Sequence, residues 1–454
     1  MIMTRTKRGI RVNSDHAQNG GAVGAIWRSR LIEAARRNCH DHDCVSISNG
    51  AKTRIAFSQS LGLGMAEPEI ATHRKRRLAV FLDGTWNAVD ANTNVWRMKS
   101  LCATKGTDDV DQLIFYAKGV NGFWGGVFGK GLDDVIKAAY EWLIDQYVAG
   151  DEIFIFGFSR GAYAARSLAG LITKCGLLQA GGALGVKQLY TRYQHSEADT
   201  IWHLFENPVA VTDREEQWLI KYSQRVSIKV VGVWDTVGAL GLPFGNIPGI
   251  SRSSFKWLHT GLRRPLENAY HAIAIDEHRR AFSPTLWTVR KPKEPNDAET
   301  PPPRTLNSVE QRWFVGAHAN VGGGCDSDLL AQIPLRWMMQ KASMHGLAFK
   351  HDVDLDGDVL TAKTSNSYAD FMYGIYSDFS DRYYRPIGEA PRVLADGTHS
   401  NVNETIDASV FNRWQTDQSY RPSNLTAWAQ LHKADPMALK NSVRADQPQT
   451  SVPD

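Results

Sequence analysis

The stretch Asp151-Glu-Ile-Phe-Ile-Phe-Gly-Phe-Ser-Arg-Gly161 decides which fold this sequence predicts. Its first half is a run of β-branched and aromatic residues, typical of a parallel strand that is buried on both faces. Its second half fits the pattern G-x-S-x-G, and residues 162–172 continue as a predicted helix. At such a strand-to-helix turn a serine hydroxyl is exposed, and the flanking glycines let strand and helix approach without Cβ clashes. The stretch therefore predicts a nucleophilic Ser159 on an α/β fold.

Strands and helices are predicted to alternate on both sides of this turn. Short apolar runs predict strands, and apolar residues spaced three and four apart predict helices. The predicted strands lie at 78–82, 112–116, 226–234, 272–275 and 311–315, and the predicted helices at 94–101, 132–147 and 328–345. This order implies a parallel sheet with right-handed crossovers. We therefore predict an α/β-hydrolase-like fold: a mostly parallel sheet with helices on both faces and inserted cap segments.

The charge of the chain is unevenly distributed. Its 454 residues include 52 Lys and Arg and 48 Asp and Glu. Residues 1–77 hold 14 basic and 6 acidic side chains, a net charge of +8, so the remainder carries −4. Because residues 1–73 lack sustained apolar periodicity, we predict that they form a basic, disordered tail. The hydrolase domain is predicted over 74–432, with an insertion at about 180–225, a C-terminal extension at about 350–432, and a second disordered tail over 433–454.

Neither a membrane span nor a secretory signal is expected. No apolar run approaches the ~18 residues of a membrane-spanning helix, and no apolar segment of signal-peptide length follows the basic start. We therefore expect a cytoplasmic protein, or one exported by a secretion system that reads no signal peptide.

A serine nucleophile needs a base, and the base needs an acid that orients it. In hydrolases with this turn the acid follows the serine in the chain, and the histidine follows the acid. Asp235 ends one predicted strand and Asp276 ends the next. An aspartate at the carboxyl end of a parallel strand lies on the functional edge of the sheet. The spacing therefore leaves both aspartates open as the acid.

His318 is the predicted base among 14 histidines. It follows a predicted strand and is surrounded by small residues that leave room for an imidazole ring. His271 and His278 lie in a passage between a strand and a helix, and we interpret them as structural or exposed.

An oxyanion hole requires two backbone N–H donors. One normally comes from the residue after the nucleophile, here Arg160, and the other from a loop after an earlier strand. Asp83 and Gly84 begin such a loop, so we predict that it supplies the second donor. Asp83 is alternatively a metal ligand, an acceptor behind the site or a turn-forming residue.

Two segments have metal-like composition. Cys39-His-Asp-His-Asp-Cys44 places its ligands too close together for a tetrahedral zinc cage. Asp352-Val-Asp-Leu-Asp-Gly357 begins like a calcium loop, but Lys363 stands where the loop needs its bidentate glutamate. We therefore predict no metal and no organic cofactor.

Several motifs resemble a known family when they are taken together. They are Leu82-Asp-Gly-Thr-Trp-Asn87, Thr93-Asn-Val95, Gly157-Phe-Ser-Arg-Gly-Ala-Tyr-Ala-Ala-Arg166, Val233-Trp-Asp-Thr-Val237, Phe314-Val-Gly-Ala-His318 and Val321-Gly-Gly-Gly324. Over roughly residues 76–430 the chain resembles the catalytic domain of type VI secretion phospholipase effectors, a group that includes many uncharacterised α/β-hydrolases.

The resemblance implies Ser159 as nucleophile, His318 as base and Asp235, not Asp276, as acid. It implies a phospholipid or other lipid ester as substrate, peripheral contact with a membrane, and a secretion apparatus or an immunity protein as partner. Nucleic acid is not an expected partner. The alternatives are a soluble carboxylesterase or thioesterase, and a non-catalytic, hydrolase-like interaction protein.

Overall fold

The structure is a computed structural model of the chain. It describes residues 3–6, 9–12, 74–84, 92–119, 128–195, 198–206, 208–237, 262, 265–291, 304–324, 329–355, 358, 361–370, 381–394 and 397–445. The chain divides into two units, Met1–Thr72 and His73–Asp454. In the first unit β1 (Met3–Thr6) pairs antiparallel with β2 (Gly9–Val12). The rest of the tail that was predicted to be disordered lies outside the described residues.

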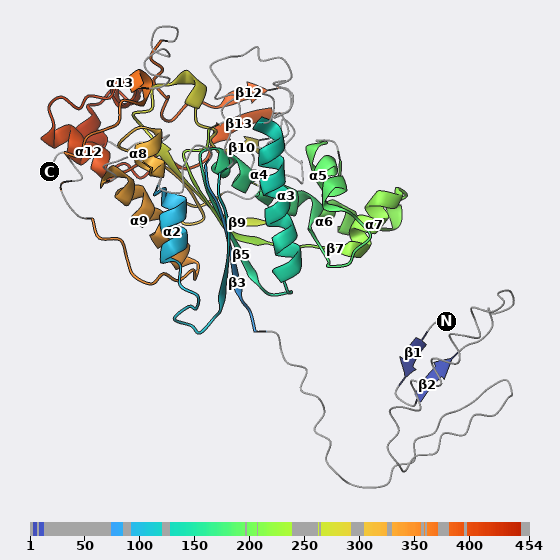
Figure 1. Ribbon diagram of the computed structural model, residues 1–454. Helices are drawn as coiled ribbons and strands as arrows, with labels where there is room; N and C mark the ends of the chain where they lie inside the picture. Colours follow the sequence, from blue (N-terminus) through green and yellow to red (C-terminus); the bar gives the residue numbers. More distant parts are fainter. Residues whose placement is uncertain are drawn as a thin grey trace, which may run out of the picture. The chain divides into compact units, whose positions relative to one another are not determined.

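A seven-stranded sheet forms the centre of the second unit (Figure 1). Its strands, in spatial order, are β14 (Glu404–Ile406), β11 (Val309–Phe314), β9 (Leu266–Ala274), β8 (Ile228–Trp234), β5 (Glu152–Phe158), β3 (Arg77–Leu82) and β4 (Gln112–Ala117). Every neighbouring pair is parallel. The prediction of a mostly parallel α/β sheet is therefore confirmed. All carboxyl ends of the strands lie at one edge, where ligands bind in folds of this class.

Helices cover both faces of the sheet (Figure 1). On β3, Leu78, Val80 and Leu82 pack into one apolar cluster, whereas Ala79 and Phe81 pack into another. This alternation follows from the two-residue period of a strand. The first cluster includes residues of α3 (Phe128–Gln146) and α4 (Arg160–Cys175), and the second residues of α2 (Asn94–Leu101) and α9 (Leu329–Met344). Two layers of helix thus bury a sheet that is apolar on both faces.

The insertion predicted at about 180–225 is helical. The chain leaves the body after β6 (Leu177–Leu178), returns through its antiparallel partner β7 (Ser223–Gln224), and between them forms α5 (Val186–Gln194), α6 (Ile201–Glu206), η1 (Pro208–Ala210) and α7 (Arg214–Tyr222). The Tyr190 hydroxyl donates a hydrogen bond to Asp133 of α3 over 2.7 Å, and α5 and α6 also contact α4. The β6–β7 pair follows the C-terminal end of α4, so the base of the insertion lies at the end of that helix remote from Ser159.

The C-terminal extension adds a small sheet and helices that the sequence pattern did not predict. The sheet is antiparallel, with β13 (Gly397–Asn401) between β10 (Thr288–Lys291) and β12 (Arg392–Leu394). The helices are α10 (Ser367–Asp370), α12 (Ala408–Thr416) and α13 (Ser423–Leu431). Buried residues of α12 and α13, with Ile273 of β9 and Trp313 of β11, form a third apolar cluster.

The prediction that the chain is disordered from Lys433 is wrong as far as Ala445. A short helix, η5 (Pro436–Leu439), follows α13. The indole N–H of Trp428 donates to the carbonyl of Ala445 over 2.7 Å, and the N–H of Ala445 donates to the carbonyl of Glu404. These bonds and the burial of Ala445 fix the polar end onto the body. Residues 446–454 lie outside the described residues. Among the described helices, none has the length and apolarity that crossing a bilayer requires.

Candidate active site

Ser159 occupies a sharp turn between β5 and α4. Its backbone has φ 57° and ψ −120°. A positive φ is uncommon for a residue other than glycine and stores strain at the turn. A Cβ at Gly157 would lie 2.3 Å from the carbonyl oxygen of Gly161, and one at Gly161 would lie 2.1 Å from that of Leu82. Only glycines therefore allow α4 to start so close to β3 and β5.

The structure brings Ser159, His318 and Asp235 together at the carboxyl edge of the sheet. Ser159 follows β5, Asp235 follows β8, and His318 begins the short helix α8 (His318–Gly322) after β11. The Ser159 Oγ lies 2.8 Å from His318 Nε2, and His318 Nδ1 lies 2.5 Å from Asp235 Oδ2. A carboxylate only accepts hydrogen bonds, so Nδ1 carries the imidazole proton and Nε2 accepts from the serine hydroxyl. This is the bonding order of a serine, its base and the acid that orients the base.

Asp235 is fully buried but well supplied with donors. Its Oδ1 accepts from the N–H of Ala274 over 3.0 Å and from Arg385 Nη1 over 2.6 Å. Its Oδ2, which accepts from His318, lies 3.0 Å from Arg385 Nη2. Burial opposes ionisation of the carboxyl group, but the charge of Arg385 and the hydrogen bond from His318 outweigh it and hold the pKa of Asp235 well below its ordinary value. The Asp235 carboxyl group is therefore ionised at neutral pH.

The imidazole ring of His318 is confined by two aromatic side chains. The ring centroid of Phe158 lies 4.7 Å from that of His318, and the ring of Phe282, in η3 (Arg280–Phe282), meets it edge-on at 5.1 Å. The backbone N–H of His318 donates to Glu277 over 3.2 Å. Glu277 is buried, which disfavours its charge, but paired hydrogen bonds from Arg279 lower its pKa to about 2. His318 is thus fixed through both its ring and its backbone.

Asp276, the other candidate acid, does not share this arrangement. Its Oδ2 accepts from the N–H of Gly316 over 2.7 Å and from the Tyr420 hydroxyl over 3.1 Å. Burial raises its pKa. Arg279, three residues after Asp276 in the chain, pairs with Glu277.

His271 and His278, the two histidines interpreted as structural or exposed, contact backbone groups. His271 is fully buried, and its Nε2 accepts from the N–H of Thr236 over 3.0 Å. Burial lowers its pKa to about 3, so the ring is neutral. His278 Nδ1 lies 3.2 Å from the carbonyl of Tyr383. These contacts agree with the interpretation of both residues as structural.

The geometry does not support the predicted second oxyanion donor. The N–H of Asp83 donates to the carbonyl of Ala117 over 3.0 Å, and the N–H of Gly84 donates to the Asp83 carboxylate over 2.7 Å. Gly84 nevertheless lies beside Ser159, since a Cβ at Gly84 would be 3.3 Å from the Cβ of Ser159. Arg160 is the first residue of α4, so its N–H lies at the positive end of that helix.

Asp83 acts as a buried acceptor behind the serine. Its Oδ2 accepts from the hydroxyls of Thr93 over 2.7 Å and Tyr116 over 3.0 Å. Across the described ranges no three His, Cys, Asp or Glu side chains group as a metal site would require. Asp352 pairs with Arg336 over 3.2 Å, whereas Asp356 and the segment 39–44 lie outside the described residues.

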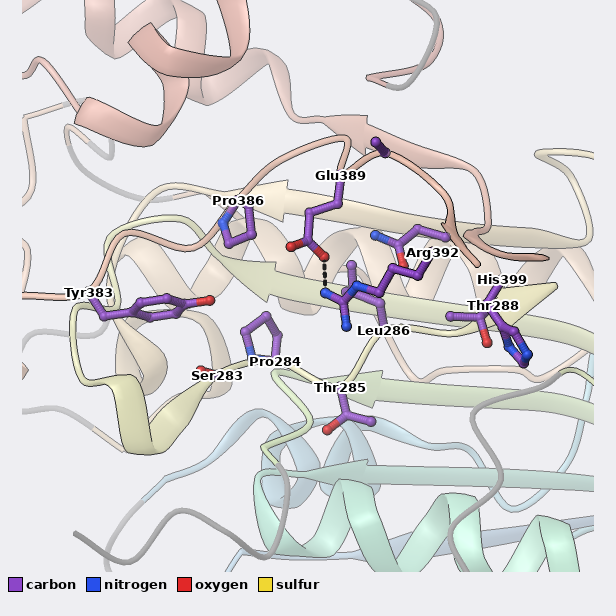
Figure 2. A pocket seen from close by; sticks show the side chains of 12 residues that line it. Ser283, Pro284, Thr285, Leu286, Thr288, Tyr383, Pro386, Glu389, Arg392 and His399 are labelled. Atoms are coloured by element: carbon purple, nitrogen blue, oxygen red, sulfur yellow. Dashed lines mark hydrogen bonds and ion pairs between the residues drawn. The ribbon is translucent and has the colours of Figure 1, made fainter. Parts of the chain in front are cut away.

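A pocket of about 360 Å³ opens beside the segments that hold Phe282 and Arg385 (Figure 2). Its lining includes Ser283 to Leu286 on one side and Tyr383, Pro386, Glu389 and Arg392 on the other. Glu389 and Arg392 form an ion pair within it (Figure 2). Ser159, His318 and Asp235 do not line this pocket.

Comparison with known proteins identifies a family. The family model described as T6SS, phospholipase effector Tle1-like, catalytic domain, matches residues 76–341. An uncharacterized protein of Saccharomyces cerevisiae is 31% identical over 166 residues, which are 36% of this chain and 22% of that protein. The chain thus spans about a fifth of the length of this curated relative.

Two solved structures are also similar. One is an uncharacterized protein from Pseudomonas aeruginosa, with 18% identity, a TM-score of 0.37, and coverage of 61% of this chain and 46% of that one. The other is the Tle1 effector bound to the VgrG spike of a type 6 secretion system, with 17% identity, a TM-score of 0.30, and coverage of 64% and 56%. Because the family model covers more than half of the sequence, this chain belongs to the family of Tle1-like phospholipase effectors of type VI secretion, whose catalytic domain it carries.

Proposed function

We propose that the chain is a serine hydrolase that cleaves carboxylic ester bonds of phospholipids. The observation that carries the proposal is the continuous series of hydrogen bonds from the Ser159 hydroxyl through His318 to the buried carboxylate of Asp235. The strained turn that holds Ser159 supports it, because a backbone with φ 57° at a non-glycine residue is expected where a side chain must be presented for reaction.

In the proposed mechanism, Ser159 Oγ attacks the ester carbonyl while His318 Nε2 takes the hydroxyl proton. Asp235 holds the Nδ1 proton in place and stabilises the imidazolium that forms. The backbone N–H of Arg160, at the positive end of α4, donates to the developing oxyanion. His318 returns the proton to the leaving alcohol, and a water molecule then releases the acyl group from Ser159 by the same two steps.

The substrate and partners are inferred from the family. The family is one of phospholipase effectors, which supports a phospholipid over a small soluble ester. We propose that the protein acts on a membrane surface without spanning it, that a type VI secretion apparatus carries it there from the cytoplasm, and that an immunity protein neutralises it in the producing cell. The solved structure of a Tle1 effector is described as bound to the VgrG spike of a type 6 secretion system.

Labelling with a fluorophosphonate, followed by hydrolysis assays on phospholipid vesicles and on short acyl esters and thioesters, tests the proposal. Wild-type protein should react at Ser159 and release fatty acid from vesicles. Ser159→Ala should lose labelling and about 10³-fold or more of the activity. Ser419→Ala is the matched control, because its exposed hydroxyl donates to Asp417 and should be irrelevant to turnover.

An active Ser159→Ala protein would refute the mechanism. Turnover of short acyl esters or thioesters without any release of fatty acid from vesicles would instead identify a soluble carboxylesterase or thioesterase. A folded wild-type protein that is neither labelled nor active would indicate a non-catalytic interaction protein.

A further inference from the structure

Arg385 is a fully buried arginine outside the part of the chain that the family model matches. That match ends at residue 341, and Arg385 lies in the C-terminal extension with none of its side chain exposed. A buried guanidinium is costly unless its charge is paired and its N–H groups are bonded. Packing alone therefore does not explain why an arginine is buried at this position.

The guanidinium of Arg385 contacts both carboxylate oxygens of Asp235, including the Oδ2 that His318 binds. Nη1 donates to Asp235 Oδ1 over 2.6 Å, and Nη2 lies 3.0 Å from Oδ2, which gives the two-pronged geometry of a strong arginine–carboxylate pair. Nη1 also donates to the carbonyl of Ala274 over 2.7 Å, and Nη2 to that of Phe282 over 2.5 Å. The ring of Phe282 packs on His318. Arg385 thus holds the Asp235 carboxylate and also the backbone of Phe282, whose ring packs against His318.

We propose that Arg385 is a positioning residue that completes a serine–histidine–aspartate–arginine series and sets the lower pH limit at which the enzyme works. The inference rests on the proposed function, because it assigns Arg385 a role in the same reaction. It also means that the C-terminal extension is part of the active site and not an appendage to it.

The sign of the pH effect follows from charge alone. The base works only while the Asp235–His318 pair holds a single proton, on Nδ1, and a second proton inactivates it. A neighbouring positive charge opposes uptake of that second proton, whichever of the two residues receives it. Removal of the Arg385 charge should therefore move the acid limb of the pH–rate profile to higher pH.

Other charged groups near the pair do not replace this effect. Among the described residues, Glu277 faces His318, but Arg279 pairs with it. His271 lies near Asp235 and is neutral, and the charge of the buried Arg166 acts on His271. Arg385 is the cation that contacts the acid directly.

The test compares Arg385→Gln, Arg385→Lys and the control Arg382→Gln, which alters an exposed arginine of the same segment. For each variant, kcat and KM for a short soluble ester are measured from pH 4 to pH 9 (roughly the range that brackets an unperturbed histidine). Titration of the His318 ring by NMR in each variant gives a readout that does not depend on turnover.

Arg385→Gln should move the acid limb and the NMR titration upward by about one to three pH units, the size of effect that a directly paired charge produces. Arg385→Lys keeps the charge but loses the paired geometry, so its acid limb should stay near that of the wild type while kcat falls about tenfold. Arg382→Gln should leave both unchanged.

Two results would overturn the proposal while leaving the proposed function intact. One is an active Arg385→Gln protein with the wild-type pH profile. The other is failure of both Arg385 variants to fold, which would make the residue purely structural. A wild-type protein with no hydrolase activity would instead refute the proposed function itself.

Discussion

Replacement of Gly161 by alanine should separate the nucleophile from its base without changing any reacting group. Gly161 is the second residue of α4. A Cβ there would lie 2.1 Å from the carbonyl oxygen of Leu82 and 2.6 Å from that of Asp83, whereas real Cβ contacts essentially never fall below 3.0 Å. Both obstacles are backbone atoms, so neither can rotate away.

The start of α4 must therefore move away from β3 by about 0.9 Å, the difference between 3.0 and 2.1 Å. Ser159 lies two residues before Gly161 and moves with it, which lengthens the 2.8 Å contact between its Oγ and His318. A displacement of about 1 Å at a reacting group costs roughly 10²-fold in rate. Overpacking of this kind also lowers the free energy of unfolding by about 1–3 kcal/mol.

The assay is kcat/KM on a soluble ester together with the rate of fluorophosphonate labelling, and urea unfolding reports the stability. Gly185→Ala is the control, since a Cβ at Gly185 meets nothing within 4 Å. It should keep wild-type activity. A folded Gly161→Ala protein with wild-type kcat/KM would refute the argument that Gly161 keeps Ser159 within hydrogen-bond distance of His318.

Three further outcomes are expected. Asp235→Asn should lower kcat/KM by about 10³- to 10⁴-fold because the amide no longer fixes the imidazole, whereas folded Asp276→Asn should stay largely active; the reverse order would transfer the acid role. Burial lowers the pKa of His271 from 6.5 to about 3. The contribution of this residue to the free energy of unfolding should therefore be fully present above pH 6.5 and be lost as the pH falls toward 3. His271→Asn should remove up to about 5 kcal/mol of that loss in urea unfolding, and unchanged pH dependence would contradict this. Removal of residues 1–73 should preserve soluble-ester turnover and weaken salt-sensitive binding to anionic vesicles; a truncated protein that does not fold, or vesicle binding that ignores both truncation and salt, would count against it.

Much of the fold was predictable because its signals are local. Buried parallel strands read as short apolar runs, and helix α2 was predicted with its observed bounds, 94–101. The serine turn carries its own glycines, so Ser159 could be placed from five consecutive residues. The shared edge of a parallel sheet predicted that strand-end aspartates lie near His318, but it left Asp235 and Asp276 open, and only the family resemblance favoured Asp235.

The features that the sequence did not predict depend on contacts between residues that are far apart in the chain. Strand β14 has only three residues, of which Glu404 and Thr405 are polar, so the sequence contains no apolar run that would predict it. Arg385 lies between two tyrosines and the pair Pro386-Ile387, and this local sequence does not reveal that its partner is an aspartate 150 residues earlier in the chain. The partners of the Asp83 and Gly84 N–H groups depend on how the loop turns after β3, which composition does not specify.

The position of β14 has a consequence for synthesis on the ribosome. Until residue 404 has emerged, β11 has a neighbour on one side alone, β9, and its other edge presents unpaired backbone groups. At roughly 5–20 residues per second the sheet stays open for several seconds after β11 is made. An unfinished chain therefore exposes an unpaired strand edge that can associate with other chains. Translation must therefore pass residue 404 before this edge of the sheet is covered.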